Sequence, residues 1–484
     1  MANVATTNNQ SKEADALSSV ALLLAGAVFL LMMIAGLLMR SAQGKLIDLD
    51  PTLFYQLMTA HGAGMVGAAA LSGAAIMWLF LGRHVSLNKL AFKAFLALFL
   101  LGVVLILYSI FVGGFGGGWT FLYPLPAHSG GVWETAAAAT FLVGLLLVGA
   151  GFLVLYFEMG RAILVRYGNL SQALAWPLVF RGKMETVPPP TIVASTVIVI
   201  FNSVGTVVGA ATLAISLINL FVPTFEIDAL LAKNMIYFFG HVFINASIYM
   251  AVIGVYEILP EYTGRPWKVS RPFAIGWSAV LLFVLAVYPH HLLQDMVMPP
   301  WMLVMGQVVS YLSGLPILAV TAFAMLGYVS GSGMKWDLAS ALLFLGVFGW
   351  SVGVVPAIID GIISINKVMH NTLWVPGHFH TYLLVGEVAM SFGVMAWIVR
   401  SKQDVALFSG LQRAVFWTYV VGALGFAMVF LTSGAASVPR RWAVHAPEWI
   451  MQDRIATLLG IVTLLSAVYF VTRFGSRLAS GERK

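Results

Sequence analysis

Two histidines separated by one residue, His378 and His380, open an apolar stretch of the sequence. On a helix with about 3.6 residues per turn, residues i and i+2 point about 200° apart, so the two imidazoles face opposite sides of one helix. That geometry suits two planar metal macrocycles, one on each side of the helix, better than one mononuclear site. A histidine in a membrane helix is more often a hydrogen-bonding residue than a ligand, so the pair alone leaves both interpretations open.

The composition is that of a polytopic membrane protein. Of 484 residues, 60% are hydrophobic and 9% are charged, whereas soluble domains have about 25% charged residues. The chain has no cysteine, which excludes disulfides, zinc–thiolate sites, iron–sulfur clusters, covalently attached haem and a dinuclear copper–thiolate centre within it. The net charge of +7 is attributed to loop lysines and arginines, and no nucleic-acid partner is expected.

A window of about 20 apolar residues predicts a series of membrane-spanning helices. The twelve expected spans are residues 19–39, 58–82, 88–112, 133–157, 191–221, 230–258, 271–293, 303–329, 336–364, 372–399, 412–434 and 455–473. The expected fold is an all-α, polytopic membrane bundle over residues 19–473, with cytoplasmic tails at residues 1–18 and 474–484. Lysine and arginine are more frequent in loops after even-numbered spans, so both termini are predicted to be cytoplasmic.

Six histidines fall in one layer near the outer ends of these spans. They are His61, His241, His290, His291, His378 and His380. Scattered core histidines would fall at random depths and in either leaflet, so this convergence favours metal ligands.

The six histidines divide into three sites. His61 and His380 could sandwich a first haem with both axial positions filled, an arrangement suited to electron transfer. His378 would hold a second haem with one open face. Beside that face, the other three histidines supply nitrogen ligands for copper or iron. A haem iron that faces such a metal can reduce a small diatomic molecule.

On these residues the chain resembles the catalytic subunit, subunit I, of the haem-copper oxidase superfamily, across essentially all twelve spans. The segment from His370 to His380 is most similar to the B-type branch. The resemblance implies a low-spin haem on His61 and His380, a high-spin haem on His378, and a non-haem metal, copper or iron, on the other three histidines. We expect the haems to be b-type.

Two outer loops extend the resemblance. One contains Trp119, which we include among the cofactor-binding residues, and the other contains Arg440 and Arg441. The family's paired arginines meet haem propionates, and two guanidiniums at the outer surface suit these anions. His370 is expected to hydrogen-bond a propionate. The remaining loop histidines are assigned no role; they are His84, His128 and His445.

One position departs from the oxidases. In B-type oxidases a tyrosine, one helical turn after the first non-haem metal ligand, donates an electron and a proton when the O–O bond breaks. Here that position is Asn245, on the same helix face as His241, and its amide oxygen is expected to bind the metal or orient a bound molecule. Tyr249 lies about 12 Å beyond His241 along the helix, too far for the same role. The span at 336–364, which supplies the tyrosine in another branch, contains none.

The missing tyrosine favours a particular reaction. Nitric oxide reductases of the superfamily also lack it, although they have a carboxylate where this chain has Asn245. Coupling two NO molecules needs only two electrons and two protons, so no organic radical donor is required, whereas O2 needs four electrons quickly. We therefore expect reduction of nitric oxide to nitrous oxide at His241, Asn245 and His378, with O2 reduction by a cytochrome c oxidase as the alternative.

The short outer loops imply a partner. We expect a membrane-anchored second subunit with a cytochrome c or copper domain to donate electrons, a gaseous substrate, and a prokaryotic cytoplasmic membrane with the site towards its outer side. Asp360 and Glu387 are intramembrane acids and therefore candidates for moving protons, whereas Glu257 and Glu261 lie nearer the cytoplasmic end. The span at 303–329 has no lysine, so weak or absent proton pumping is expected. A secondary transporter is a competing interpretation, but the halves share no repeated motif.

Overall fold

The computed structural model confirms an all-α membrane bundle, with 12 helices long and apolar enough to cross a membrane among the residues it describes. It describes residues 2–400, 408 and 410–481, with side chains from Asp15 onward. The elements are α1 (Ala2–Gln43), α2 (Pro51–Leu81), α3 (Lys89–Phe111), α4 (Thr135–Tyr167), α5 (Leu170–Ala173), α6 (Trp176–Arg181), α7 (Pro190–Phe221), α8 (Ala229–Thr263), α9 (Arg271–Ala286), η1 (Tyr288–Leu292), α10 (Pro300–Ser313), α11 (Leu315–Ile317), η2 (Leu318–Phe323), α12 (Ala324–Val329), α13 (Leu338–Asp360), α14 (Ile363–Met369), α15 (Trp374–His380), η3 (Thr381–Val388), α16 (Ala389–Ile398), α17 (Gly410–Ala435), η4 (Pro447–Trp449) and α18 (Ile450–Ala479).

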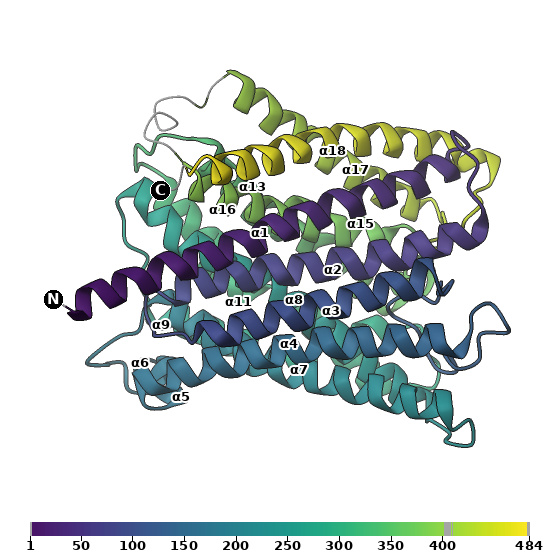
Figure 1. The fold of residues 1–484 in the computed structure, drawn as a ribbon, viewed down its shortest axis with the longest axis horizontal. Helices are drawn as coiled ribbons and strands as arrows, with labels where there is room; N and C mark the ends of the chain where they lie inside the picture. The colour runs from purple at the N-terminus through teal and green to yellow at the C-terminus, as the bar shows by residue number, and fades with distance from the viewer. Residues whose placement is uncertain (1, 401–407, 409, 482–484) are drawn as a thin grey trace.

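The long helices lie side by side, and α1 begins at the same end of the bundle at which α18 ends (Figure 1). Residues 2–18, expected as a tail, are helical and continue into the first span. Helix α18 likewise extends through most of the expected C-terminal tail, of which residues 482–484 lie outside the described residues, as does Lys402 in the loop before α17.

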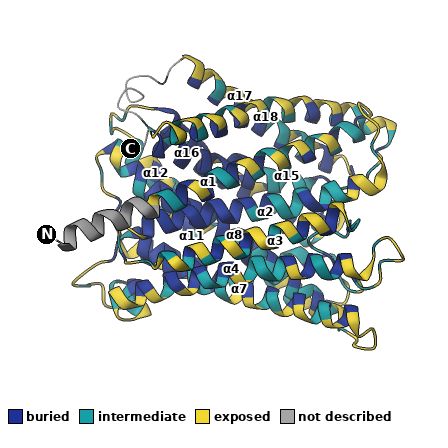
Figure 2. Ribbon diagram, in the orientation of Figure 1, coloured by how far each residue is buried: buried dark blue, intermediate teal, exposed yellow. Residues whose placement is uncertain are grey.

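Burial separates a central group of helices from a more exposed periphery (Figure 2). In the apolar stretch of each span we compared the share of residues that are buried. This share is 89% in α2, 83% in α8 and 89% in the span formed by α15, η3 and α16, against 33% in α3. Helices α2 and α8 approach closely at Gly73, where a Cβ atom would lie only 2.6 Å from the carbonyl oxygen of Ser247. Glycine at this position allows the close approach. The three most buried spans carry His61, His241 and the pair His378 and His380.

Side-chain caps set where two of these helices begin. The Asp50 carboxylate accepts hydrogen bonds from the backbone N–H groups of Thr52 and Leu53, and Pro51 occupies the first helical position of α2. The Asp228 carboxylate accepts from the N–H of Leu231 at the start of α8.

Two spans depart from regular helix at the candidate ligands. The seventh span ends its α-helix at Ala286 and continues as a 3-10 helix, η1, that carries His290 and His291. In the tenth span the α-helix ends at His380 and a π-helix, η3, follows directly. Irregular turns inside helices often occur at functional sites, because they redirect the side chains that follow.

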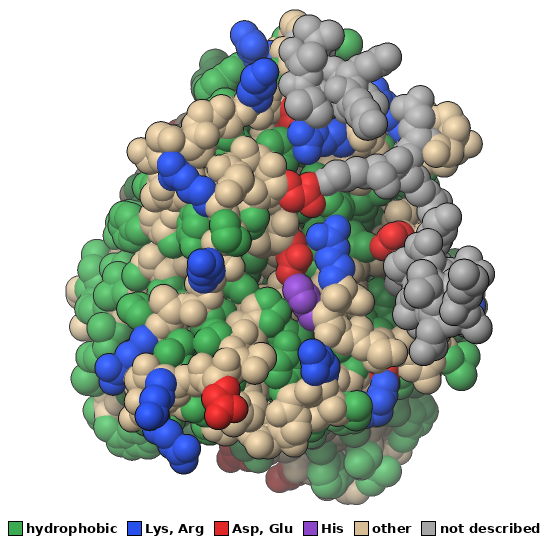
Figure 3. Space-filling view, turned by 90° about the vertical axis from the view of Figure 1, so that its left-hand side faces the viewer, with side chains coloured by type: hydrophobic (Ala, Val, Ile, Leu, Met, Phe, Trp, Pro, Cys, Tyr) green, Lys and Arg blue, Asp and Glu red, His purple; other side chains and the backbone are tan. Residues whose placement is uncertain are grey.

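The end of the bundle at which α1 begins carries many Lys and Arg side chains across its face (Figure 3). Two of its acidic residues pair with cations that the sequence did not connect to them. The Glu257 carboxylate lies 2.7 Å from Nε2 of His84 and 3.6 Å from the guanidinium of Arg83. The Asp337 carboxylate lies 3.0 Å from the guanidinium of Arg400.

At the opposite end, a buried polar cluster joins α1 to α18. Arg40 donates to the Asp453 carboxylate at 2.5 Å, and its guanidinium lies 4.3 Å from the ring centre of Phe430. Nδ1 of His445 lies 2.8 Å from the other Asp453 oxygen, and Nε2 of His445 lies 3.1 Å from the Gln43 amide. His445, to which the sequence assigned no role, therefore completes this cluster.

We expect Asp453→Ala to destabilise the bundle by about 3–5 kcal/mol, because it leaves the buried Arg40 without its counterion. The measurement is the thermal unfolding temperature in detergent, followed by circular dichroism. The double variant Arg40→Ala/Asp453→Ala should lose less stability than the two single changes added together, since the two groups are coupled. An Asp453→Ala protein that unfolds at the wild-type temperature would contradict the assigned role of the ion pair.

Candidate haem and metal centre

Every residue that the sequence analysis assigned to the site lines one cavity of about 460 Å³. The cavity lies among the helices with the deepest burial and reaches the loops that follow α3 and α17. Its lining includes His61, Trp119, His241, Asn245, His290, His291, His370, His378, His380, Arg440 and Arg441. Residues far apart in the sequence thus share one enclosed space.

His61 and His380 face each other across part of this cavity. Their ring centres are 6.3 Å apart and their planes are inclined by 23°. Nδ1 of His61 is 2.7 Å from the Met32 carbonyl oxygen, and Nδ1 of His380 is 2.6 Å from that of Pro376. Both Nδ1 atoms are therefore occupied as donors, which leaves both Nε2 atoms free to bind a metal.

The spacing fits one metal ion with two axial imidazoles. Metal–imidazole bonds are about 2.0 Å long, so a metal between two rings sets their coordinating nitrogens about 4 Å apart and their centres about 6 Å apart. The 6.3 Å separation of His61 and His380 meets this requirement. A haem iron with both axial positions filled would fit between them and would have no position left for a substrate.

His378 points to the other side of the same helix. Its Nδ1 lies 3.0 Å from the carbonyl oxygen of Gly353 in α13, so Nε2 is again the free ring nitrogen. The ring of Tyr382 packs against it edge to face, with centres 5.0 Å apart. The two side chains therefore point in opposite directions, as their spacing predicts. His380 faces α2 and His378 faces α13.

The other three histidines form a compact cluster. Ring nitrogens of His241, His290 and His291 all lie within 4.8 Å of one another. Nδ1 of His241 is 3.0 Å from Nε2 of His291, which is 3.1 Å from Nε2 of His290. Three neutral imidazoles that converge in this way suit copper, iron or zinc. The ring of Tyr237 stacks on His291 at 5.6 Å, a contact that the sequence analysis did not foresee.

Asn245 contacts the metal cluster through His241. Its amide nitrogen lies 2.7 Å from Nε2 of His241 and donates to the backbone carbonyl of the same residue at 3.0 Å. The amide therefore meets the ring nitrogen that does not face His291, so it is placed to orient the ring. Asn245 also lines the cavity.

Two arginines and a tryptophan close the outer side. Arg440 donates to the Asn371 side chain at 3.3 Å, and Arg441 donates to Thr120 at 3.1 Å. Neither forms an ion pair with a carboxylate in the described part of the chain, and burial together with the like charge of Arg441 lowers the pKa of Arg440 to about 10. Two adjacent cations on a cavity without an acidic partner favour an anionic ligand group.

Arg441 and Trp119 are held in unusual positions. Arg441 has a φ of +66°, a conformation that residues other than glycine rarely adopt. The ring of Trp119 packs on glycines of two ligand-bearing helices, since a Cβ at Gly62 would lie 2.8 Å from it and one at Gly240 would lie 3.5 Å from it. The outer loop thus contacts α2 and α8 at the level of their histidines.

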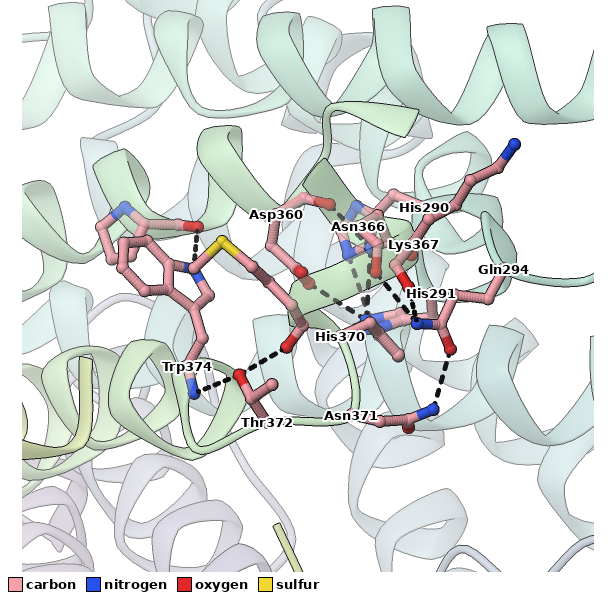
Figure 4. A network of polar contacts seen from close by, with 12 residues as sticks. His290, His291, Gln294, Asp360, Asn366, Lys367, His370, Asn371, Thr372 and Trp374 are labelled. Carbon is pink, nitrogen blue, oxygen red and sulfur yellow. Dashed lines mark hydrogen bonds and ion pairs between the residues drawn. The ribbon is translucent and has the colours of Figure 1, made fainter. Parts of the chain in front are cut away.

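His370 belongs to a polar network that ties the outer loops together (Figure 4). Its Nδ1 lies 3.1 Å from the Asp360 carboxylate and 3.2 Å from the Asn366 amide. The ring centre of His370 is 6.3 Å from that of His291. The expected partner of His370 was a propionate alone, and the pairing with Asp360, the last residue of α13, was not expected.

Gln294 connects this network to the metal cluster. Its amide donates to the carbonyls of Asn366 at 3.0 Å and Lys367 at 3.2 Å, and it accepts from Asn371 at 2.9 Å (Figure 4). Gln294 follows η1, so these bonds hold the segment of His290 and His291 against α14. A polar residue just beyond two candidate ligands was the only sequence signal for this contact.

Comparison with known proteins points to one family. The model of the family described as cytochrome c and quinol oxidase polypeptide I matches residues 17–468. Cytochrome c oxidase subunit 1 of Thermostichus vulcanus is 24% identical over 473 residues, which cover 92% of this chain and 80% of that protein. The same subunit of Thermus thermophilus is 27% identical over 284 residues, which cover 53% of this chain and only 50% of the relative.

A solved structure shares the fold. It is the cryo-EM structure of a haem-copper terminal oxidase dimer, with a TM-score of 0.76 and 19% sequence identity. The similarity covers 96% of this chain and 84% of the other. At this identity the likeness concerns the arrangement of the helices.

We expect His380→Ala to lower the haem content from about two to about one per chain and to abolish the low-spin spectrum, because one axial imidazole is lost. His290→Ala should instead lower the non-haem metal content and leave both haem spectra unchanged. Optical spectra and metal analysis of the same purified samples measure both effects. His128→Ala, in an outer loop, is the matched control. Loss of non-haem metal but not haem in His380→Ala would refute the division of the site.

We expect Arg440→Gln to lower the midpoint potentials of the haems, because a nearby cation stabilises the reduced state. The shift should be on the order of tens of millivolts, since 59 mV corresponds to a tenfold change in a one-electron equilibrium, so it should be about that size or smaller. Potentiometric titration of the purified protein measures the effect. Arg454→Gln, which removes a charge that does not line the cavity, is the control. Equal shifts in both variants would argue against a specific contact.

Proposed function

Because the chain belongs to the cytochrome c and quinol oxidase polypeptide I family, as subunit I of a haem-copper oxidase, we propose that it reduces nitric oxide to nitrous oxide. It is an integral membrane oxidoreductase of a family that binds haems and a copper or iron centre. The observation that carries the specific reaction is the side chain at the position of the oxidase tyrosine: Asn245, whose amide contacts Nε2 of His241.

The donor set fits the cofactors of the family. We assign the low-spin haem to His61 and His380, on the strength of their 6.3 Å ring separation, and the high-spin haem to His378. The non-haem metal, copper or iron, is assigned to Nδ1 of His241 and Nε2 of the two histidines of η1. When bound, the haems would supply single electrons and the non-haem metal would bind and polarise the substrate beside the high-spin haem.

The residues of the chain position these groups. Nδ1 of each haem histidine donates to a backbone carbonyl, which fixes the ring and raises the basicity of the ligand nitrogen. Asn245 holds the ring of His241 through its second nitrogen. Arg440 and Arg441 would pair with the carboxylates of a haem, and the contact of His370 with Asp360 holds the loop beside them.

The absence of an electron-donating tyrosine at position 245 is compatible with coupling two NO molecules, because that reaction needs only two electrons. Reduction of O2 remains the second candidate function, since one observation favours it. Tyr237 lines the cavity and stacks on His291, so a tyrosine does lie beside the metal cluster, although one turn before His241 and not one turn after it.

The setting of the reaction follows the same proposal. We propose a prokaryotic cytoplasmic membrane, with both termini in the cytoplasm and the cavity towards the outer side, in agreement with the positively charged end in Figure 3. Electrons would come from a membrane-anchored subunit with a cytochrome c or copper domain. The haems are proposed to be b-type, and proton pumping weak or absent.

We expect the purified, reduced enzyme with its partner to consume NO rapidly, form N2O, and take up O2 slowly. The measurement compares NO and O2 consumption at the same donor concentration, with metal analysis of the same sample. Fast O2 uptake with little NO turnover would overturn the assignment. In that case Tyr237→Phe should abolish the fast O2 uptake, whereas in a nitric oxide reductase it should leave NO turnover within about twofold.

We expect Asn245→Ala to lower NO turnover on the order of ten- to a hundredfold, because groups that orient a metal ligand contribute about this much to activity or metal affinity. Steady-state NO consumption and metal content are the two readouts. Asn219→Ala is the matched control, since it removes a buried amide that bonds a loop carbonyl away from the cavity. Wild-type turnover and metal content in Asn245→Ala would contradict the role of the amide.

A further inference from the structure

Glu387 is a buried carboxyl group that the site described above does not use. It lies in the π-helix η3 that follows His380, and its relative exposure is 0%. One carboxyl oxygen, Oε2, lies 2.9 Å from the hydroxyl oxygen of Ser247. The other oxygen, Oε1, is buried and has no hydrogen-bond partner. No cation forms an ion pair with it in the described part of the chain.

This environment favours the neutral acid. An ionised carboxylate that is removed from water without a counterion is strongly disfavoured, and such a group takes up a proton instead. A protonated carboxyl group has one donor hydrogen, and an acceptor for that hydrogen lies within reach at Ser247. The buried position of Glu387 is then compatible with a stable bundle.

The hydrogen bonds of Ser247 also favour a protonated Glu387. Its hydroxyl has a single hydrogen, yet two acceptors lie within reach: the carbonyl of Ile244 at 2.8 Å and the carboxyl of Glu387 at 2.9 Å. If Glu387 donates its proton to Ser247, the serine can donate its own hydrogen to Ile244, and each contact receives one hydrogen. If Glu387 is a carboxylate, one of the two contacts is left without a hydrogen.

Ser247 connects Glu387 to the helix that carries the metal cluster. Ser247 is in α8, the helix that also carries His241 and Asn245, and Ile244 itself lines the cavity. On the other side of Glu387, the Ser391 hydroxyl lies 3.0 Å from its backbone carbonyl and 2.9 Å from the hydroxyl of Ser72. Buried polar groups of α2, α8 and the tenth span thus adjoin Glu387 on the side of the bundle end at which α1 begins.

We propose that Glu387 is a proton donor to the reaction in the cavity and acts through Ser247. Its carboxyl proton moves to the Ser247 oxygen while the serine hydrogen moves on towards the oxygen released as water, and the resulting carboxylate is reprotonated from the cytoplasmic side. The electrons come from the reduced cofactors. The inference rests on the proposed reduction of a small molecule, but both candidate reactions consume protons, so it does not depend on the choice between NO and O2.

The test compares Glu387→Gln with the wild-type enzyme in a single turnover. The amide keeps the size of the side chain and its bond to Ser247 but carries no transferable proton. We expect proton uptake, followed with a pH-indicating dye, to slow at least about tenfold, with unchanged haem content and spectra. Ser247→Ala should slow uptake similarly. Glu158→Gln is the matched control, because Glu158 is also a buried glutamate of a span but pairs with Arg161. Wild-type uptake in Glu387→Gln would overturn the proposal.

An infrared reading is independent of activity. The reduced-minus-oxidised difference spectrum should contain a protonated carboxyl band that shifts in D2O, disappears in Glu387→Gln and remains, at a shifted frequency, in Ser247→Ala. A wild-type spectrum without any band that Glu387→Gln removes would refute a change of the Glu387 carboxyl group during the reaction. If a preparation consumes neither NO nor O2, the proposed function is wrong. The infrared band would still show whether Glu387 carries a proton. It also serves if Glu387→Gln does not fold, because Ser247→Ala must then shift the band.

Discussion

The hydrogen bond between a histidine Nδ1 and a backbone carbonyl is the contact on which the site depends. His61, His378 and His380 each make one, to carbonyls of Met32, Gly353 and Pro376. Each bond fixes both the orientation of the ring and the nitrogen that remains free. Because two of the carbonyls belong to other helices, the ring directions depend on the packing of α1 and α13 against the ligand-bearing helices. The bundle therefore aligns the imidazoles as well as enclosing them.

Irregular helix geometry does the rest of the positioning. The 3-10 turn of η1 brings two consecutive histidines, His290 and His291, to the same cluster, with ring centres 4.2 Å apart. The π-helix after His380 similarly brings Glu387 to the interface with α8. The bonds of Gln294 then hold η1 against α14, so that the metal cluster is anchored by side chains outside it.

The sequence was sufficient to predict the bundle and the family, because both depend on local or additive properties. Apolar length predicted the spans, and residue types at one depth brought together the histidines that line the cavity. Contacts made by residues distant in the sequence could not be predicted in the same way. The pairs of His370 with Asp360 and His445 with Asp453 involve loops whose course depends on the whole bundle. The amide of Asn245 was placed on the correct helix face, but its contact with the second nitrogen of His241 depends on ring rotation, which spacing alone does not determine.

The short segment that joins His378 to His380 has a consequence for how the assembly responds to disturbance. These two histidines are separated by Phe379 alone, so covalent bonds set the distance between the two sites that they would serve. The opposing ligand His61 and the cluster on α8 and η1 belong to separate helices, whose distances from α15 depend on packing. Heating, lipid removal or a cavity-forming mutation would therefore first displace the ligands that lie opposite His378 and His380. The spacing for electron tunnelling between the two sites would be the last geometric property to change.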